Sequence, residues 1–375
     1  MPAPLLIGSC EPFSGKSAVA LGLARALLRQ GIPLRFGKPM ATLSEVPASD
    51  GIPPAPAEGG PLIDEDTRFI GTFLGLAEDR LIPSLHRLDP VTALQRLLAG
   101  DLEAGGGVAA LRAVLAPAAA PALEGALVML EAAGSLSEGL LFGLSLPQLA
   151  HGLEAEVVLA HPWHDSRSVE PLLEAQRQLG DRLAGVVLNC VVPEELPALR
   201  QEVVPALERL GLTVFGCMPR SPLLRSVTVE EIGRRLQARV LCCSERLDLL
   251  VETLSIGAMN VNSAMEFFKL RRNMAVVTGA DRTDIQLAAL EASTQCLILT
   301  GAGEPLPQLI NRSEELEVPV LKVDHDTLTT VEVIEAAIGH GRLHETVKAA
   351  YAVRLVEETC RFERLYERLR LPLPA

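Results

Sequence analysis

The sequence predicts an α/β protein in which mostly parallel sheets are covered by helices. Short apolar runs alternate with helical patterns from the first residues onward, and such alternation is typical of βαβ units. The chain is 48% hydrophobic but only 3% aromatic, so its cores consist mainly of Leu, Val, Ile and Ala, which suit helices laid on parallel strands. Its 375 residues correspond to about two or three domains.

The first block extends over residues 1–220. Its strands are predicted at Pro4–Ile7, Leu34–Lys38, Ala126–Glu131, Glu156–Ala160, Gly185–Asn189 and Thr213–Cys217. Its helices are predicted at Ser17–Gln30, Asp66–Gly75, Pro90–Ala99, Ser168–Gly180 and Glu194–Leu210. Pro, Ser, Ala and Gly dominate Ala41–Pro61, which indicates a surface loop. Gly105–Pro121 has no pattern that favours one structure.

A second, smaller αβ block is predicted at residues 239–342, after a linker at 221–238 that lacks a clean strand. Its strands are expected at Ala238–Cys242, Met274–Val277, Cys296–Leu299 and Val318–Val323, and its helices include Asp284–Ala292 and Thr329–Ala337. The charged, amphipathic tail at 343–375 predicts a helix that packs on the second domain or on another subunit, which favours a homo-oligomer.

Composition argues against several classes of function. The net charge of −13 disfavours nucleic acid as a partner, because such proteins usually carry a basic face. The most apolar stretch, from Gly105 to Leu130, is interrupted by Arg112 and two prolines, so no membrane span is expected. No basic segment precedes the first apolar run, as a signal peptide requires. Seven scattered cysteines without a CxxC pair indicate reduced thiols in a cytoplasmic protein.

A phosphate-binding loop is predicted at Gly8–Ser17, between the first strand and the first helix. Backbone N–H groups of a tight loop and of the helix N-terminus favour an anion, so Glu11, Ser14, Gly15, Lys16 and Ser17 are the predicted nucleotide-binding residues. The lysine would reach the β- and γ-phosphates, and the serine hydroxyl would hold Mg²⁺. Cys10 stands where the strict pattern has glycine, but the strand–loop–helix context supports nucleotide binding.

Carboxylates near this loop are candidates for metal binding. Glu131 ends a buried strand, close to the phosphate loop in a parallel sheet, and is a predicted Mg²⁺ ligand. Asp64 and Asp66 supply further oxygens or cap the helix that follows; the sequence leaves both roles open.

Two further groups of residues follow predicted strands. Lys38 either reaches a second, anionic ligand or the γ-phosphate, or is an exposed lysine at the end of a strand. His161 and His164 are interpreted as loop residues and not as a metal pair, because Pro162 disfavours the helical register that would align them.

These motifs resemble the dethiobiotin synthetase-like P-loop fold, in the version found in the N-terminal part of long phosphotransacetylases. The resemblance rests on Ile7–Ser17, Gly37–Pro39 and Leu130–Gly134. In the synthetases a comparable loop, Lys-Pro strand end and Glu-Gly-Ala-Gly segment surround ATP, Mg²⁺ and substrate; Ala132 stands here in place of one glycine. The resemblance implies that Asn189 contacts adenine. The synthetases' substrate-contacting residues cannot be traced through the predicted loop.

The second block carries Thr278–Asp284 followed by Leu297–Gly301, and is similar to the DRTGG domain. Asp284 and Ile285 replace the two glycines of that name. The resemblance implies a regulatory module. The predicted fold class of the chain is therefore α/β, with a parallel-sheet P-loop NTPase-like domain followed by a smaller αβ DRTGG domain. The arrangement is similar to standalone cyanobacterial proteins of the phosphotransacetylase family, and no acetyltransferase activity is expected.

Three functions follow from these observations. The first is a regulatory protein that binds ATP and Mg²⁺ and senses a second ligand, or dimerises, through the DRTGG domain. The second is an ATP-dependent ligase, in which Lys16 and Lys38 would be catalytic and a small carboxylate or carbamate would be phosphorylated. A weak ATPase is compatible with the first. The third is an interaction scaffold with a degenerate loop, a reading that Cys10 favours and intact Lys16 and Ser17 oppose.

Overall fold

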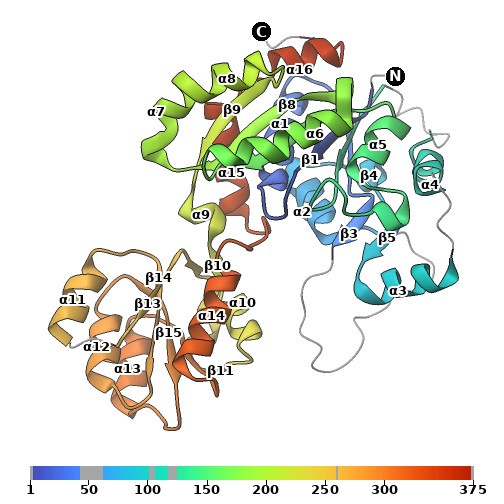
Figure 1. Cartoon of the computed structure of the whole chain (residues 1–375). Coiled ribbons are helices and arrows are strands. Elements are labelled where there is room, and N and C mark those ends of the chain that lie inside the picture. Colours follow the sequence, from blue (N-terminus) through green and yellow to red (C-terminus); the bar gives the residue numbers. More distant parts are fainter. Residues whose placement is uncertain (1–2, 43–61, 101–105, 117–124, 259–260, 373–375) are drawn as a thin grey trace. The chain divides into compact units, whose positions relative to one another are not determined.

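The computed structural model describes residues 3–42, 62–100, 106–116, 125–258 and 261–372 (Figure 1). Most of the predicted loop at Ala41–Pro61 lies outside these residues. The chain divides into two compact units. The first joins Met1–Arg220 to Leu343–Ala375, and the second comprises Ser221–Arg342.

The first unit is built on a seven-stranded sheet in the order β4-β2-β6-β1-β7-β8-β9, and all its registered pairs are parallel. The strands are β1 (Leu5–Gly8), β2 (Leu34–Gly37), β4 (Leu81–Ile82), β6 (Leu127–Glu131), β7 (Glu156–Pro162), β8 (Leu183–Val191) and β9 (Val214–Pro219). Each strand predicted for this block forms. Because parallel strands end at one edge of a sheet, the carboxyl ends of β2, β6 and β1 are neighbours.

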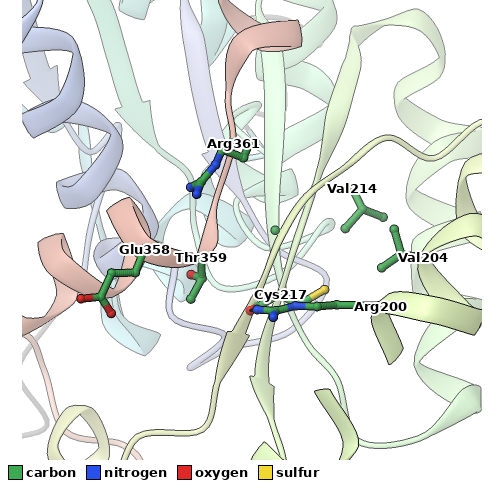
Figure 2. Close-up of a pocket in the computed structure, with 8 residues that line it drawn as sticks. Arg200, Val204, Val214, Cys217, Glu358, Thr359 and Arg361 are labelled. Atoms are coloured by element: carbon green, nitrogen blue, oxygen red, sulfur yellow. Dashed lines mark hydrogen bonds between the residues drawn. The ribbon is translucent and has the colours of Figure 1, made fainter. Parts of the chain in front are cut away.

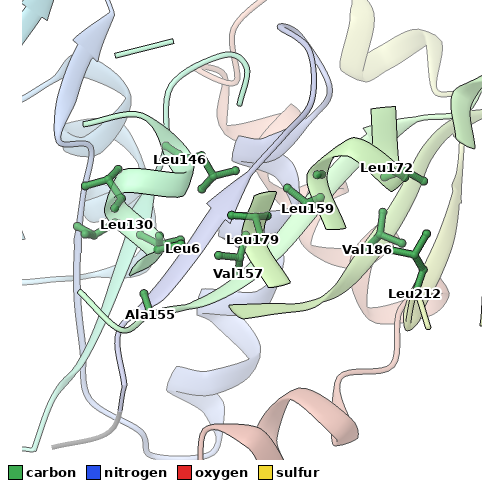
Figure 3. Packing of buried hydrophobic residues seen from close by; sticks show 14 of the residues in the cluster. Leu6, Leu130, Leu146, Ala155, Val157, Leu159, Leu172, Leu179, Val186 and Leu212 are labelled. Carbon is green, nitrogen blue, oxygen red and sulfur yellow. The ribbon is translucent and has the colours of Figure 1, made fainter. Parts of the chain in front are cut away.

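Both faces of this sheet are buried. On one face, Leu6, Leu130 and Leu159 of the central strands pack against α5 (Leu146–Gly152) and α6 (Val169–Leu179) (Figure 3). The alternate residues Leu5 and Ile7 are also fully buried. Aliphatic side chains therefore fill both faces of β1, as expected of a parallel strand covered by helices.

Helix α1 (Lys16–Arg29) follows β1 and packs against α15 (Thr346–Thr359). The close approach of these two helices needs a glycine, because a Cβ on Gly22 would lie 2.5 Å from Cβ of Val356. The tail also forms α16 (Glu363–Arg368). It was predicted to pack on the second domain or on another subunit, but α15 lies on the first helix of its own first unit.

The other helices of the first unit are α2 (Glu65–Leu74), α3 (Pro90–Ala99), α4 (Gly106–Leu115), α7 (Leu196–Ala198) and α8 (Val204–Arg209). A π-helical turn at Leu199–Val203 separates α7 from α8, so the helix predicted at Glu194–Leu210 is not regular. β3 (Met40–Thr42) and β5 (His86–Leu88) form a separate, small parallel pair.

The second unit has a five-stranded sheet in the order β11-β16-β15-β14-β13, in which only the edge pair β11–β16 is antiparallel. Its strands are β11 (Arg239–Cys242), β13 (Thr253–Ile256), β14 (Met274–Gly279), β15 (Thr294–Thr300) and β16 (Val320–Lys322). Its helices are α9 (Pro222–Arg225), α10 (Val229–Arg235), α11 (Val261–Lys269), α12 (Thr283–Leu290), α13 (Pro307–Glu315) and α14 (Thr327–Ala337).

The segment predicted as a linker, residues 221–238, is folded. It contains α9, β10 (Val227–Thr228) and α10, and β10 pairs with β12 (Leu250–Val251). Val227, Val229 and Ile232 are buried in the core of the second unit. These elements are only two to seven residues long, too short for a recognisable periodic pattern.

Candidate functional site

The glycine loop connects β1 to α1 at the carboxyl edge of the sheet. Gly15 caps α1 with φ +87°, a conformation that L-residues with side chains rarely adopt. No side chain caps the amides of the first turn. Asn189, at the end of β8, donates from Nδ2 to the Ser14 carbonyl at 2.8 Å, and a Cβ on Gly15 would lie 2.1 Å from that nitrogen. The asparagine side chain therefore holds the loop through the backbone of Ser14.

Cys10 does not disturb the loop in the way its departure from the glycine pattern suggests. Its backbone does not have a positive φ, whereas Phe13 takes a φ of 54°. The Cys10 thiol donates to the Pro171 carbonyl at 3.5 Å, and burial, with the nearby Glu11, raises its pKa to about 12. A side chain fits at this position because the left-handed turn of the loop occurs elsewhere.

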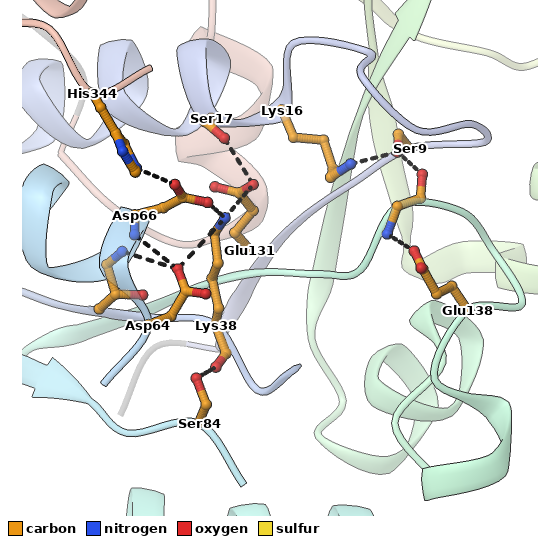
Figure 4. Close-up of polar contacts among 12 residues, drawn as sticks. Ser9, Lys16, Ser17, Lys38, Asp64, Asp66, Ser84, Glu131, Glu138 and His344 are labelled. Carbon is orange, nitrogen blue, oxygen red and sulfur yellow. Dashed lines mark hydrogen bonds and ion pairs between the residues drawn. The ribbon is translucent and has the colours of Figure 1, made fainter. Parts of the chain in front are cut away.

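Lys16, the first residue of α1, is folded back along the loop. Its Nζ donates to Ser9 Oγ at 3.0 Å, and the residue is only 8% exposed (Figure 4). Burial lowers the pKa of Lys16, and the positive charge of Lys38 adds to this, while Glu131 opposes it. The ammonium therefore lies beside the loop that would hold phosphate. An anion bound there would offset the cost of burying its positive charge.

Ser17 and Glu131 meet across the ends of β1 and β6. The Ser17 hydroxyl donates to Glu131 Oε1 at 2.9 Å, and the glutamate is 3% exposed. Its second oxygen, Oε2, is buried and has no hydrogen-bond partner. A buried carboxylate oxygen without a partner is costly, so this atom is poised for a cation or a donor.

Lys38, which follows β2, is surrounded by acids. Its Nζ forms an ion pair with Asp66 Oδ2, and lies 3.3 Å from Glu131 Oε1 and 3.8 Å from Asp64 Oδ1 (Figure 4). Burial alone would lower the pKa of Lys38, but Glu131, Asp66 and Asp64 together outweigh it and raise the pKa above its ordinary value. The predicted alternatives were a ligand-binding lysine or an exposed one; the residue is 5% exposed and paired.

Asp64 and Asp66 take different roles. Asp64 caps α2, accepting from the amides of Asp66 and Thr67 at 2.9 and 3.3 Å. Asp66 lies in the first turn of that helix and contacts Lys38 with one oxygen and His344 with the other. The capping alternative thus applies to Asp64, while Asp66 joins the charged cluster around Glu131.

The donor set at this edge suits a divalent cation held jointly with phosphates. Within the described ranges, no three His, Cys, Asp or Glu side chains have the geometry of a complete metal cage. Mg²⁺ does not need such a cage, because it usually takes one or two carboxylates, waters and phosphate oxygens. Ser17 Oγ and the unpartnered Glu131 Oε2 fit this arrangement, with Asp66 adjacent through Lys38.

Two cavities of the first unit are lined by residues outside the cluster of Lys16, Ser17, Lys38, Asp66 and Glu131. One, of about 310 Å³, is lined by Glu11, His161, His164 and residues of the following turn. There Glu11 Oε1 is 3.4 Å from His164 Nε2, so Glu11 lines this cavity. The other, of about 320 Å³, lies between β9, the π-helical turn and the end of α15, and none of the predicted site residues lines it (Figure 2).

Sequence reasoning missed three residues of the site. Ser9 Oγ accepts a hydrogen bond from Lys16 Nζ and donates to the Gly134 carbonyl at 2.7 Å. Glu138 accepts from the Gly134 amide and so holds the segment that follows Glu131. His344 contacts Asp66 from 278 positions away. Ser9 was inside the motif that was recognised, but no local pattern marks the other two.

The family comparisons agree with this architecture. Residues 4–228 match a family described as AAA domain, and residues 231–337 match the DRTGG domain. The first match alone covers more than half of the chain. The chain belongs to this AAA domain family. Its P-loop domain is of the dethiobiotin synthetase-like type, which confirms the resemblance proposed from the sequence.

The curated relatives are longer proteins. The chain is 27% identical over 339 residues to a phosphate acetyltransferase of Deinococcus radiodurans, covering 84% of this chain and 44% of the relative. It is 24% identical over 396 residues to a phosphate acetyltransferase of Synechocystis sp., covering 99% of this chain and 52% of the relative. The chain thus spans about half the length of these relatives, in agreement with the N-terminal region of long phosphotransacetylases.

Two solved structures that match the chain resemble it only distantly. Chloroplast FtsY from Physcomitrella patens has a TM-score of 0.33 at 18% identity, covering 58% of both chains. The CBS and DRTGG regulatory region of a Clostridium perfringens pyrophosphatase, solved with diadenosine tetraphosphate, has a TM-score of 0.27 at 17% identity, covering 46% of this chain and 70% of that chain. Likenesses this weak carry no functional argument. None of the described helices is long and apolar enough to cross a bilayer.

Proposed function

We propose that this protein is a regulatory protein that binds ATP with Mg²⁺ in its first unit and uses the DRTGG unit to sense a second ligand or to dimerise. The observation that carries the proposal is the pairing of Ser17 with Glu131 beside the loop, with Glu131 Oε2 left unpartnered. A hydroxyl at the start of a P-loop helix and a carboxylate at the end of a neighbouring strand suit a Mg²⁺ ion that is held jointly with nucleotide phosphates.

The loop supplies the complementary features for phosphate. The first turn of α1 has no side-chain cap. The amides of Ala18 and Val19 donate to the Gly15 carbonyl, so those of Lys16 and Ser17 are the ones that would meet an anion at the positive end of the helix dipole. Lys16 lies beside the loop, and the buried Ser14 hydroxyl has no partner. When bound, the cation would neutralise phosphate charge, while Ser17 and Glu131 hold it and Lys16 contacts the phosphates.

The surroundings of Lys38 favour a regulatory role over a ligase activity. A ligase would need this ammonium to hold the carboxylate or carbamate that is phosphorylated, but three protein carboxylates already surround it. A substrate anion placed there would meet the negative charge of Asp64, Asp66 and Glu131 as well as the lysine. We therefore propose that any ATP hydrolysis is weak. We also propose a cytoplasmic location, which the seven cysteines support because none of them is in a disulfide.

Calorimetric titration of MgATP into the full chain tests the proposal. Wild-type protein is expected to bind with micromolar affinity, and Lys16→Ala to lose at least tenfold because the only loop ammonium beside the phosphates is removed. Lys269→Ala, at an exposed lysine of α11, is the matched control and is expected to bind like the wild type. Absence of binding in the wild type would overturn the nucleotide assignment and leave a scaffold.

A further inference from the structure

His344 belongs to the segment through which the chain re-enters the first unit. Leu343 is the first residue of that segment, and the segment lies after both family matches, which end at residues 228 and 337. No role for His344 follows from either family. Its side chain nevertheless lies at the charged cluster beside the phosphate loop (Figure 4).

The contacts of His344 extend a continuous polar chain. Ser17 donates to Glu131, whose Oε1 lies 3.3 Å from Lys38 Nζ, and Lys38 pairs with Asp66 Oδ2. His344 Nε2 then pairs with the other oxygen of Asp66. The carboxylate of Asp66 is thus held on both sides, by an ammonium and by an imidazole, and its side chain is only 13% exposed.

The imidazole is itself fixed in place. Its ring packs against Phe69 of α2, with the ring centroids 5.6 Å apart. Four residues further on, Lys348 is 1% exposed and pairs with Glu345 at 2.9 Å, which anchors the start of α15. Because α15 packs on α1, the helix that begins at Lys16, the orientation of His344 is tied to the phosphate-loop helix.

We propose that His344 is a positioning residue for the metal-binding edge of the site: it orients Asp66, and through Asp66 and Lys38 it sets where the Glu131 carboxylate meets a nucleotide-bound divalent cation. The inference rests on the proposed function. Hydrogen-bonded partners of ligating carboxylates typically contribute 10–100-fold to metal affinity by fixing ligand orientation. His344 lies outside both matched domains, and it can fix the orientation of the carboxylates at this site in the same way.

The test separates metal-dependent from metal-independent nucleotide affinity. ATP is titrated into full-length protein in EDTA, and Mg²⁺ is then titrated at fixed ATP. His344→Leu is expected to raise the Mg²⁺ half-saturation concentration about tenfold while leaving ATP affinity in EDTA within about twofold of wild type. His344→Gln retains an N–H at the position of Nε2 and is expected to restore the Mg²⁺ response.

His151→Leu is the matched control, because this exposed histidine of α5 donates from Nε2 to the Gln178 carbonyl and does not belong to the charged cluster. Equal losses in EDTA and in Mg²⁺ would show that His344 only supports the fold, and an unchanged Mg²⁺ response in a folded His344→Leu would overturn the positioning role. A wild type that binds no ATP in either condition defeats the proposed function itself, and the positioning role with it. Thermal unfolding of each variant shows whether it is folded.

Discussion

At the scale of single residues, the site is a buried cluster in which a positively charged lysine lies among negatively charged carboxylates. Lys38 forms ion pairs with three carboxylates at once, and Glu131 keeps one oxygen without a partner. Removing one member of such a buried network costs more than the pair it breaks, because the remaining charges stay desolvated. The cluster therefore holds its shape before any ligand arrives, which is what a site that binds a charged ligand requires.

His161, at the end of β7, makes stability depend on pH. Its Nε2 donates to the Ser168 carbonyl at 2.9 Å, which leaves Nδ1 without a proton or a partner. Burial lowers the pKa of His161, with a smaller opposing effect from that hydrogen bond. The unfolded chain therefore binds its proton at a higher pH than the folded chain does. As pH falls through and below the ordinary histidine range of roughly 6.5, the free energy of unfolding must fall.

The prediction is that His161→Gln, which keeps a donor toward Ser168, loses less stability than wild type between about pH 7.5 and 5.5. Urea unfolding followed by Trp163 fluorescence measures this, since Trp163 is the single tryptophan and is buried in the first unit. His86, whose pKa burial also lowers, leaves part of the slope in the variant. Parallel slopes for the two proteins would contradict the assignment to His161.

The sequence predicted the residues of the site that lie in recognisable motifs. Lys16 and Ser17 follow a strand and a glycine, and Glu131 ends a buried run, so local pattern placed all three at one sheet edge. It could not predict the state of Lys38, because the pairing partners come from α2 and β6. His344 was out of reach for the same reason: contact with Asp66 depends on where the chain returns after the whole second unit.

At the scale of elements, the strands were easier to predict than the connections between helices. Buried parallel strands are continuous apolar runs, and each predicted strand of the first block forms within a few residues of its predicted bounds. The linker predicted at 221–238 was wrong, because the elements of this segment are only two to seven residues long and carry no recognisable periodic pattern. The tail was correctly predicted as helical, but amphipathicity does not identify which surface a helix covers.

The packing of α15 on α1 gives a prediction at this scale. Gly22→Ala places a methyl group 2.5 Å from Cβ of Val356, which is 2% exposed and cannot move aside freely. Alanine is the better helix former by about 1 kcal/mol, but overpacking a tight core costs about 1–3 kcal/mol, so the variant is expected to be less stable.

A double-mutant cycle with Val356→Ala identifies the cause. Val356→Ala alone loses apolar contact, yet it makes room for the new methyl group, so the double variant is expected to be more stable than the sum of the single losses by about 1 kcal/mol. Urea unfolding of the four proteins measures the coupling. Additive losses would mean that the two side chains do not meet in solution.

At the scale of the whole molecule, the chain leaves the first unit at Arg220 and returns to it at Leu343, so the DRTGG unit is an insertion in sequence. Each unit has its own sheet and buried clusters. Contiguous αβ blocks were predicted; the return of the tail to the first unit was not, because no local pattern encodes such a long-range contact.

This division predicts two thermal transitions, only one of which responds to nucleotide. A ligand that binds the folded first unit at about 100 times its Kd stabilises that unit by about 2.7 kcal/mol. Trp163 fluorescence reports the first unit alone, whereas far-UV circular dichroism reports helices of both units. MgATP is expected to raise the fluorescence midpoint and to move one of two dichroism steps, and Lys16→Ala is expected to abolish both changes. If instead a single dichroism transition coincides with the fluorescence transition and moves with it, the two units unfold as one cooperative block, and nucleotide binding in the first unit stabilises the second as well.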